Sequence, residues 1–259
     1  MHLTSPPRRL LITVCTYNER DNLPLLIPEI FAQLPEAEVL VVDDNSPDGT
    51  GRLADAIADR DSRVQVQHRP GKLGLGSAIL SGFRFALDLN YEFVLNMDAD
   101  FSHHPRYLPA LLALMDRCEV AIGSRYVPGG AAKGWPLSRH LMSRCINLYA
   151  RWLLWLPTRD NSGAYRCYRV SKLKQLDLNL VRARGYAFQE EILYRCSRVG
   201  CRIQETPIVF EDRQRGMSKI NYREIITALW VILLLGIDNL RGVPVEPTSK
   251  DAHKKTSSH

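Results

Sequence analysis

Short apolar runs alternate with stretches of helical spacing through the first half of the chain. Five runs rich in leucine, isoleucine and valine predict strands at residues 10–15, 39–42, 64–67, 93–98 and 120–123. Between them, apolar residues recur every three or four positions, which predicts helices at residues 23–34, 50–60, 77–89 and 105–115. This alternation predicts an α/β fold, with a mostly parallel central sheet and helices on both faces.

The second half is less regular. It holds a long helical pattern at residues 137–156, a helix start near residue 185 and a strand at residues 203–210. An apolar run at residues 225–237 is shorter than the roughly 20 residues of a membrane span, so it either lies at a membrane interface or packs on the domain. We expect one folded domain over residues 1–219, an apolar or amphipathic helix over 220–242 and a disordered tail over 243–259.

Composition narrows the class of protein. The chain has 259 residues, of which 45% are hydrophobic and 24% charged, as in ordinary globular proteins. The net charge of +6 suits phosphate-bearing ligands or an anionic membrane surface. No basic arm with interleaved aromatics is present, which argues against nucleic acid as a partner. Six scattered cysteines without a CxxC pair favour reduced thiols and a cytoplasmic protein.

Polar clusters follow four of the predicted strands at the point where each strand ends. They are Thr16–Glu19, Asp43–Thr50, Asp98–Asp100 and Gly123–Tyr126. Ligands of parallel α/β sheets bind at the carboxyl ends of the strands. Each cluster alone has a simple explanation as a turn or a solvated charge, but four on one edge predict a site. No GxGxxG follows the first strand, which excludes a dinucleotide-binding dehydrogenase.

Asp98 and Asp100 are separated by one residue at the end of a buried strand. Because side chains alternate along a strand, the two carboxylates point to the same side and repel each other unless a cation or a proton intervenes. Hard oxygen ligands of this kind suit Mg²⁺ or Mn²⁺, and Mg²⁺ commonly combines one or two carboxylates with substrate phosphates. Two solvated aspartates at a strand end are the alternative, and the neighbouring clusters favour the metal.

Three further stretches carry candidate chemistry. The glycine-containing loop 69–77 places Lys72 near a nucleotide or serves as a simple turn. The basic stretch 211–219 has a central glycine and is typical of a hinged lid over a phosphate. Glu190 and Glu191 are candidates for orienting basic partners, although acidic residues are also favoured in the first turn of a helix.

Together these motifs resemble family 2 glycosyltransferases of the GT-A nucleotide-diphospho-sugar transferase fold, and among them the dolichol-phosphate (polyprenol-phosphate) mannosyltransferases. The match runs from about residue 10 to residue 219. The resemblance implies that the nucleobase and ribose are held by Tyr17, Glu19, Val42 and Asp44. It implies that Asp98, Ala99 and Asp100 hold the donor diphosphate through Mg²⁺ or Mn²⁺. Arg125 and Arg139 are then expected near the phosphates or the acceptor, with Arg213 and Lys219 closing over the donor.

The implied reaction is inverting transfer of mannose from GDP-mannose to a polyprenyl phosphate, by an enzyme peripheral to the cytoplasmic face of a membrane. A transferase that uses a UDP-sugar, with a lipid phosphate or a hydroxyl acceptor, is the first alternative; a non-catalytic nucleotide-sugar-binding membrane scaffold is the second. The chain departs from the family pattern at Ser102, where some members have a glutamine that completes the metal shell. The sequence leaves open whether an accessory membrane subunit takes part.

Overall fold

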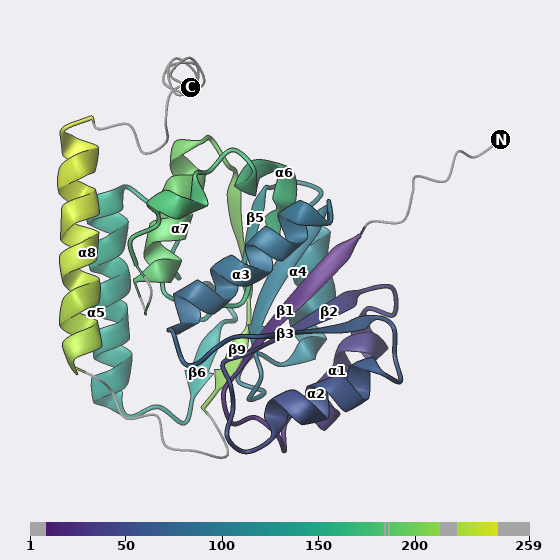
Figure 1. The fold of residues 1–259 in the computed structure, drawn as a ribbon. Helices are drawn as coiled ribbons and strands as arrows, with labels where there is room; N and C mark the ends of the chain where they lie inside the picture. Colours follow the sequence, from purple (N-terminus) through teal and green to yellow (C-terminus); the bar gives the residue numbers. More distant parts are fainter. Residues whose placement is uncertain (1–8, 184, 186, 213–221, 243–259) are drawn as a thin grey trace, which may run out of the picture.

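A seven-stranded sheet forms the centre of the molecule, with strand order β3-β2-β1-β4-β7-β5-β8 (Figure 1). The computed structural model describes residues 9–183, 185, 187–212 and 222–242. The strands are β1 Leu10–Thr16, β2 Glu38–Asp43, β3 Val64–His68, β4 Phe93–Asp98, β5 Val120–Ser124, β7 Arg166–Arg169 and β8 Ile203–Pro207. β7 runs antiparallel to β4 and β5, while the other pairs in this sheet are parallel. The predicted α/β fold class is therefore confirmed.

Helices cover both faces of this sheet. One face is covered by α1 Leu23–Gln33, α2 Thr50–Ala58 and α4 Leu108–Leu114, which follows a short 3-10 turn, η1 Pro105–Tyr107. The other is covered by α3 Leu75–Asp88, α5 Leu137–Leu154, α6 Val170–Leu173, η2 Leu178–Leu180, α7 Phe188–Arg198 and α8 Tyr222–Leu240. Strand residues divide between the two cores: Leu11 joins the α3 side, whereas Ile12 and Val14 join the α1 side. Burial on both faces explains why these strands are continuous apolar runs.

The predicted strand at residues 203–210 is divided in the structure. β8 ends at Pro207, which has no amide hydrogen to continue the ladder. The next amide, of Ile208, donates instead to the carbonyl oxygen of Ser124 at 3.0 Å. The chain then enters β9 Val209–Glu211, which pairs in parallel with β6 Ala131–Lys133 in a separate two-stranded sheet. The sequence pattern did not predict β6 or β7.

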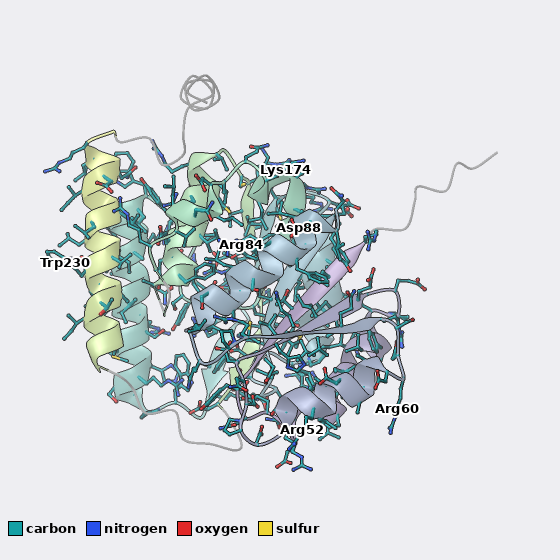
Figure 2. The ribbon with its side chains drawn as sticks, in the orientation of Figure 1. Arg52, Arg60, Arg84, Asp88, Lys174 and Trp230 are labelled. Atoms are coloured by element: carbon teal, nitrogen blue, oxygen red, sulfur yellow. The ribbon has the colours of Figure 1, made fainter. Side chains whose placement is uncertain are left out.

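α8 lies alongside α5 at one edge of the molecule (Figure 1). Ala228, Ile232 and Leu235 of α8 are buried in the core. Gly236 allows close approach, because a Cβ there would lie 2.6 Å from Cδ2 of Leu153. One face of the apolar run 225–237 thus packs on the domain, while Trp230 points outward (Figure 2). None of the helices in the described residues combines the length and the apolar character needed to cross a membrane.

Gly82 sets how closely α3 approaches β1, and replacing it tests that packing. A Cβ at residue 82 would lie 2.6 Å from Cγ2 and 2.7 Å from Oγ1 of the buried Thr13. We expect Gly82→Ala to lower the free energy of unfolding by about 1–2 kcal/mol, because overpacking outweighs the gain in helix propensity. Urea denaturation measures the loss. Gly71→Ala is the matched control, since a Cβ there meets nothing within 4 Å; equal stability of both variants would refute the packing argument.

Candidate active site

The strand register brings the predicted site residues of β1, β2 and β4 to one edge. Cys15 pairs with Val42 on one side and with Asp98 on the other. The Cys15 thiol reflects this position, since burial raises its pKa and the nearby carboxylates of Asp98 and Asp44 raise it further. The predicted nucleotide-side residues and the predicted metal carboxylates therefore share one rim of the sheet.

Tyr17, Glu19 and Asp44, the residues predicted to bind the nucleotide, lie at the β1 and β2 part of this rim. The ammonium group of Lys72 lies over the ring of Tyr17, 4.4 Å from its centroid, which places the loop 69–77 at the candidate site. Arg69, from the same loop, pairs with Asp44 at 2.7 Å. Burial raises the pKa of Asp44, and Arg69 opposes that shift. The Asp44–Arg69 pair thus joins the end of β2 to the loop that precedes α3.

Glu19 and Val42 occupy different environments on this side. The Glu19 amide donates to Thr50 Oγ1 at 3.0 Å, and Glu19 Oε2 accepts from the Asn22 side chain at 2.7 Å. The turn after β1 is therefore tied to the first residue of α2. The Val42 side chain is fully buried in the core, and its carbonyl oxygen accepts a hydrogen bond from Thr16 Oγ1 at 3.4 Å.

At the end of β4, Asp98 and Asp100 are held by the residues that follow them. Asp100 Oδ1 accepts hydrogen bonds from the amide of Ser102 at 3.0 Å and from its hydroxyl at 2.6 Å. Ser102 thus orients Asp100. Phe101 between them has a φ of 63°, a left-handed conformation that non-glycine residues adopt at some cost. Ala99 is buried.

His103, in the turn after β4, contacts both the backbone and the side chain of Asp98. Its Nδ1 accepts a hydrogen bond from the Asp98 amide at 3.1 Å and lies 3.5 Å from Asp98 Oδ2. The sequence motif contained His103, but nothing in the local pattern assigned it this role.

The two carboxylates fit a divalent cation that is shared with a substrate. Asp98 and Asp100 offer hard oxygen ligands, and a quarter of the Asp98 side chain is exposed. Over the described residues, no group of three or more His, Cys, Asp or Glu side chains converges to hold a metal. A donor set of this size suits Mg²⁺ or Mn²⁺ completed by phosphate oxygens and water.

Arg125 follows β5 and forms a buried ion pair with Asp160. Its Nε donates to Asp160 Oδ2 at 2.7 Å and its Nη2 to Oδ1 at 2.6 Å, while Nη2 also reaches Ser162 at 2.9 Å. Burial opposes both charges, yet Asp160 raises the pKa of Arg125 and Arg125 keeps the pKa of Asp160 below its ordinary value. Arg125 is therefore a fixed positive charge, and Asp160 is a site residue that the sequence reasoning missed.

Arg139 lies across the site from the carboxylates and is joined to them by aromatic contacts. Its Nη1 donates to both oxygens of Asp212 at 3.0 Å, and its guanidinium lies 4.2 Å from the ring centroid of Trp135. Trp135 contacts Phe210 at 5.4 Å, and Phe210 contacts His103 at 5.5 Å. The predicted arginines and the predicted metal carboxylates thus border one continuous region. Arg213 and Lys219 lie outside the described residues.

Glu190 and Glu191, the predicted candidates for orienting basic partners, are both buried. The Glu190 side chain is buried, and burial raises its pKa to about 7, with Asp160 adding to the shift and Arg166 and Arg125 opposing it. Glu191, the next residue, instead pairs with Arg195 at 2.9 Å. Both glutamates belong to the first turn of α7, as the preference for acidic residues at a helix start predicts. The sequence gave no sign that their surroundings differ.

A mostly parallel sheet with paired aspartates at its carboxyl edge, bordered by fixed arginines, defines a glycosyltransferase of the GT-A fold. The model of the family described as Glycosyl transferase family 2 matches residues 11–177, and the chain belongs to that family.

Two relatives of known name align over most of the chain. The chain is 44% identical over 245 residues to a polyprenol monophosphomannose synthase of Mycolicibacterium smegmatis, covering 92% of each chain. It is 45% identical over 213 residues to an undecaprenyl-phosphate mannosyltransferase of Micrococcus luteus, covering 82% of this chain and 88% of the relative.

Solved structures share the fold at lower identity. A glucosyl-3-phosphoglycerate synthase of Mycobacterium tuberculosis, solved with Mn²⁺, UDP and glucosyl-3-phosphoglycerate, matches with a TM-score of 0.63 at 18% identity. The match covers 92% of this chain and 81% of that one. S. aureus TarS residues 1–349, solved with UDP-GlcNAc, match with a TM-score of 0.58 at 20% identity, covering 95% and 69%.

The raised pKa of Glu190 makes stability depend on pH. Since the folded state keeps the proton up to about pH 7 and the unfolded chain releases it near 4.5, folding weakens as the pH rises between those values. We expect wild type to lose roughly 3 kcal/mol more than Glu190→Gln over this range, as measured by urea denaturation at a series of pH values. The exposed Glu36→Gln should follow wild type. Parallel profiles of wild type and Glu190→Gln would contradict the assignment.

Proposed function

We propose that this glycosyltransferase transfers mannose from GDP-mannose to a polyprenyl phosphate, with a divalent cation at Asp98 and Asp100. The observation that carries the proposal is the 44% identity, over 92% of the chain, to a polyprenol monophosphomannose synthase. The paired carboxylates and the fixed arginines of the candidate site support it, because the reaction involves phosphate groups on both substrates.

Departure of a nucleoside diphosphate concentrates negative charge, and that charge must be stabilised as it develops. Asp98 and Asp100 would hold the cation, which would supply Lewis-acid stabilisation of the diphosphate when bound. Ser102 keeps the Asp100 carboxylate oriented for this role, while His103 accepts a hydrogen bond from the Asp98 backbone amide. Arg213 and Lys219 are proposed to close over the donor, and Tyr17, Glu19, Val42 and Asp44 to hold its nucleobase and ribose.

The acceptor decides whether the enzyme needs a general base. A hydroxyl acceptor must lose a proton, whereas a phosphomonoester, with a second pKa of about 6, is already an anion and a nucleophile at neutral pH. In-line attack on an oxocarbenium-like sugar then inverts the anomeric centre. Such an enzyme needs positive charge to place the acceptor, and Arg125 and Arg139 provide it at this edge of the site.

A UDP-sugar donor is the second candidate. Solved structures with the same fold carry UDP or UDP-GlcNAc. Tyr17, Glu19 and Asp44 contain no feature that separates guanine from uracil. A non-catalytic scaffold is less well supported, because both carboxylates of the proposed metal pair are present and Ser102 orients that of Asp100. With a lipid acceptor, the protein would work as a peripheral enzyme at the cytoplasmic face of a membrane, with or without an accessory subunit.

Donor and acceptor are tested by direct transfer. The full chain is incubated with polyprenyl phosphate, Mn²⁺ or Mg²⁺, and radiolabelled GDP-mannose, UDP-glucose or UDP-GlcNAc. Of the three donors, we expect only GDP-mannose to give label in the lipid fraction. We also expect GDP with Mn²⁺ to raise the melting temperature more than UDP with Mn²⁺ does. Transfer from a UDP-sugar in preference to GDP-mannose would refute the assignment of mannose as the transferred sugar. Transfer from none of the three donors would refute the assignment of a lipid phosphate as the acceptor.

The metal role is tested by Asp100→Ala. Since this change removes an oxygen ligand from the proposed cation site, we expect transfer to fall by at least about a thousandfold, like wild type in EDTA. The control is Asp59→Ala, which removes an exposed carboxylate from the end of α2. Thermal melting should show that both variants remain folded. Wild-type transfer by Asp100→Ala would refute the metal assignment.

A further inference from the structure

A buried asparagine, Asn147, lies in the middle of α5. Its side chain is 3% exposed. Asparagine is one of the less favourable residues in a helix interior, because its side chain competes for the hydrogen bonds of the backbone. A residue that opposes its local structure is expected to serve a purpose elsewhere in the fold. For Asn147 that purpose lies in its hydrogen bonds to the segment that follows α5.

The Asn147 side chain uses its whole hydrogen-bonding capacity. Its Oδ1 accepts from the backbone amides of Asn161 at 2.5 Å and Ser162 at 3.2 Å. Its Nδ2 donates to the carbonyl oxygen of Ser143 at 2.8 Å and to Ser162 Oγ at 3.0 Å. A side-chain amide has two lone pairs and two hydrogens to offer, and all four are used here. An aspartate would lack the donor group and an alanine both groups, so the place is specific for an amide.

Ser162 connects Asn147 to Arg125. Its hydroxyl oxygen accepts from Asn147 Nδ2 at 3.0 Å and from Arg125 Nη2 at 2.9 Å. The same guanidinium nitrogen donates to Asp160 Oδ1 at 2.6 Å, so both of its hydrogens are used. Arg125 Nε donates to Asp160 Oδ2, which fixes the guanidinium plane at two of its three nitrogens. These contacts together determine the direction of the third nitrogen, Nη1.

Nη1 is the nitrogen of Arg125 that remains for a ligand. In the part of the chain that the structure describes, Nε and Nη2 donate to protein acceptors and Nη1 does not. Arg125 also borders a pocket of about 500 Å³, whose wall includes Asn147 together with Gly129 and Gly130 of the segment after β5. A guanidinium that is held at two nitrogens offers the third to an anion in one fixed direction.

We propose that Asn147 is a positioning residue: through Ser162 it sets the direction in which Arg125 meets the phosphate group of the acceptor. The inference rests on the proposed function, in which Arg125 places a phosphate-bearing acceptor, and it adds the residue of α5 on which that placement depends. The segment that carries Asp160 is held from two sides, because Glu205 of β8 accepts from the Asp160 amide at 2.9 Å and Asn147 accepts from the next two amides. Of these two supports, Asn147 is the one that reaches the guanidinium through the Ser162 hydroxyl.

Transfer kinetics with the full chain test the proposal. Asn147→Ala removes all four side-chain hydrogen bonds, whereas Ser162→Ala removes only the hydroxyl between Asn147 and Arg125. We expect each change to raise KM for the polyprenyl phosphate roughly tenfold, because a contact that orients a charged group is lost, with kcat and KM for GDP-mannose within about twofold of wild type. The double variant should raise KM no further than Asn147→Ala alone, since both changes interrupt one path. Ser162→Thr, which keeps the hydroxyl, should restore most of the affinity lost in Ser162→Ala.

Asn239→Ala is the matched control for a loss of stability. Asn239 is a buried asparagine of α8 that accepts from the Tyr194 hydroxyl of α7 at 3.2 Å, a bond that involves neither Arg125 nor Ser162. This variant should lower the melting temperature, as Asn147→Ala does, without raising KM for the acceptor. Ser162 is only partly buried, so Ser162→Ala keeps the test valid if Asn147→Ala does not fold.

The orientation of Arg125 can also be measured without any substrate. The Arg125 Nε–H signal in proton–nitrogen NMR spectra, assigned by its loss in Arg125→Lys, should exchange with water at least about tenfold faster in Asn147→Ala than in wild type or Asn239→Ala.

Three outcomes would overturn the proposal: an unchanged KM for the acceptor in both Asn147→Ala and Ser162→Ala, an equal rise of KM in Asn239→Ala, or an Arg125 signal that exchanges at the same rate in wild type and Asn147→Ala. Failure of the proposed function gives a different result. In that case wild type transfers no sugar to polyprenyl phosphate, and the NMR comparison still decides whether Asn147 orients Arg125.

Discussion

The buried ion pair between Arg125 and Asp160 holds the basic side of the site in place. Taking both charges out of water is costly, and the pair repays that cost only because two parallel hydrogen bonds and a third from the Arg125 amide to Asp160 satisfy the groups. The segment that carries Asp160 is fixed in turn by Glu205 of β8, which accepts from the amides of Arg159 and Asp160. The ends of three strands, β5, β7 and β8, thereby form one unit around a fixed positive charge.

Acidic and basic groups are kept separate within the site by this arrangement. Asp98 ends β4 and Asp100 lies in the turn after it, whereas the two arginines are each held by a carboxylate of their own, Asp160 or Asp212. These partners fix the orientation of both guanidinium groups, because each accepts hydrogen bonds from its arginine. Glu190 fits the same logic: burial favours its neutral form, so it adds no further negative charge beside the Arg125–Asp160 pair at low pH.

The sequence was sufficient for the elements whose signal is local. β1, β2 and β4 are apolar runs bounded by polar residues, and their ends were placed within a residue or two because a buried strand must stop where charge begins. β7 has no such signal. Arg166 begins it, and the terminal nitrogens of this fully buried side chain donate to the carbonyl oxygens of Gln189 and Asn161, which only the tertiary fold supplies. The roles of His103, Trp135 and Asp160 escaped prediction for the same reason, since each depends on a partner from another element.

The two outer helices show how a hydrophobic run misleads when it is considered without its neighbours. The continuous apolar run of α8 is the segment of the sequence that most suggests contact with a membrane. In the structure, however, Ala228, Ile232 and Leu235 are buried against the domain. α5 has the weaker signal because arginines interrupt it, and its buried side includes Asn147 and the small Ala150. Its large apolar residues consequently remain outside. Exposure on the outer helices is therefore decided by which apolar side chains are left over after the core is complete, and on α5 these include Leu137, Trp152 and Leu141.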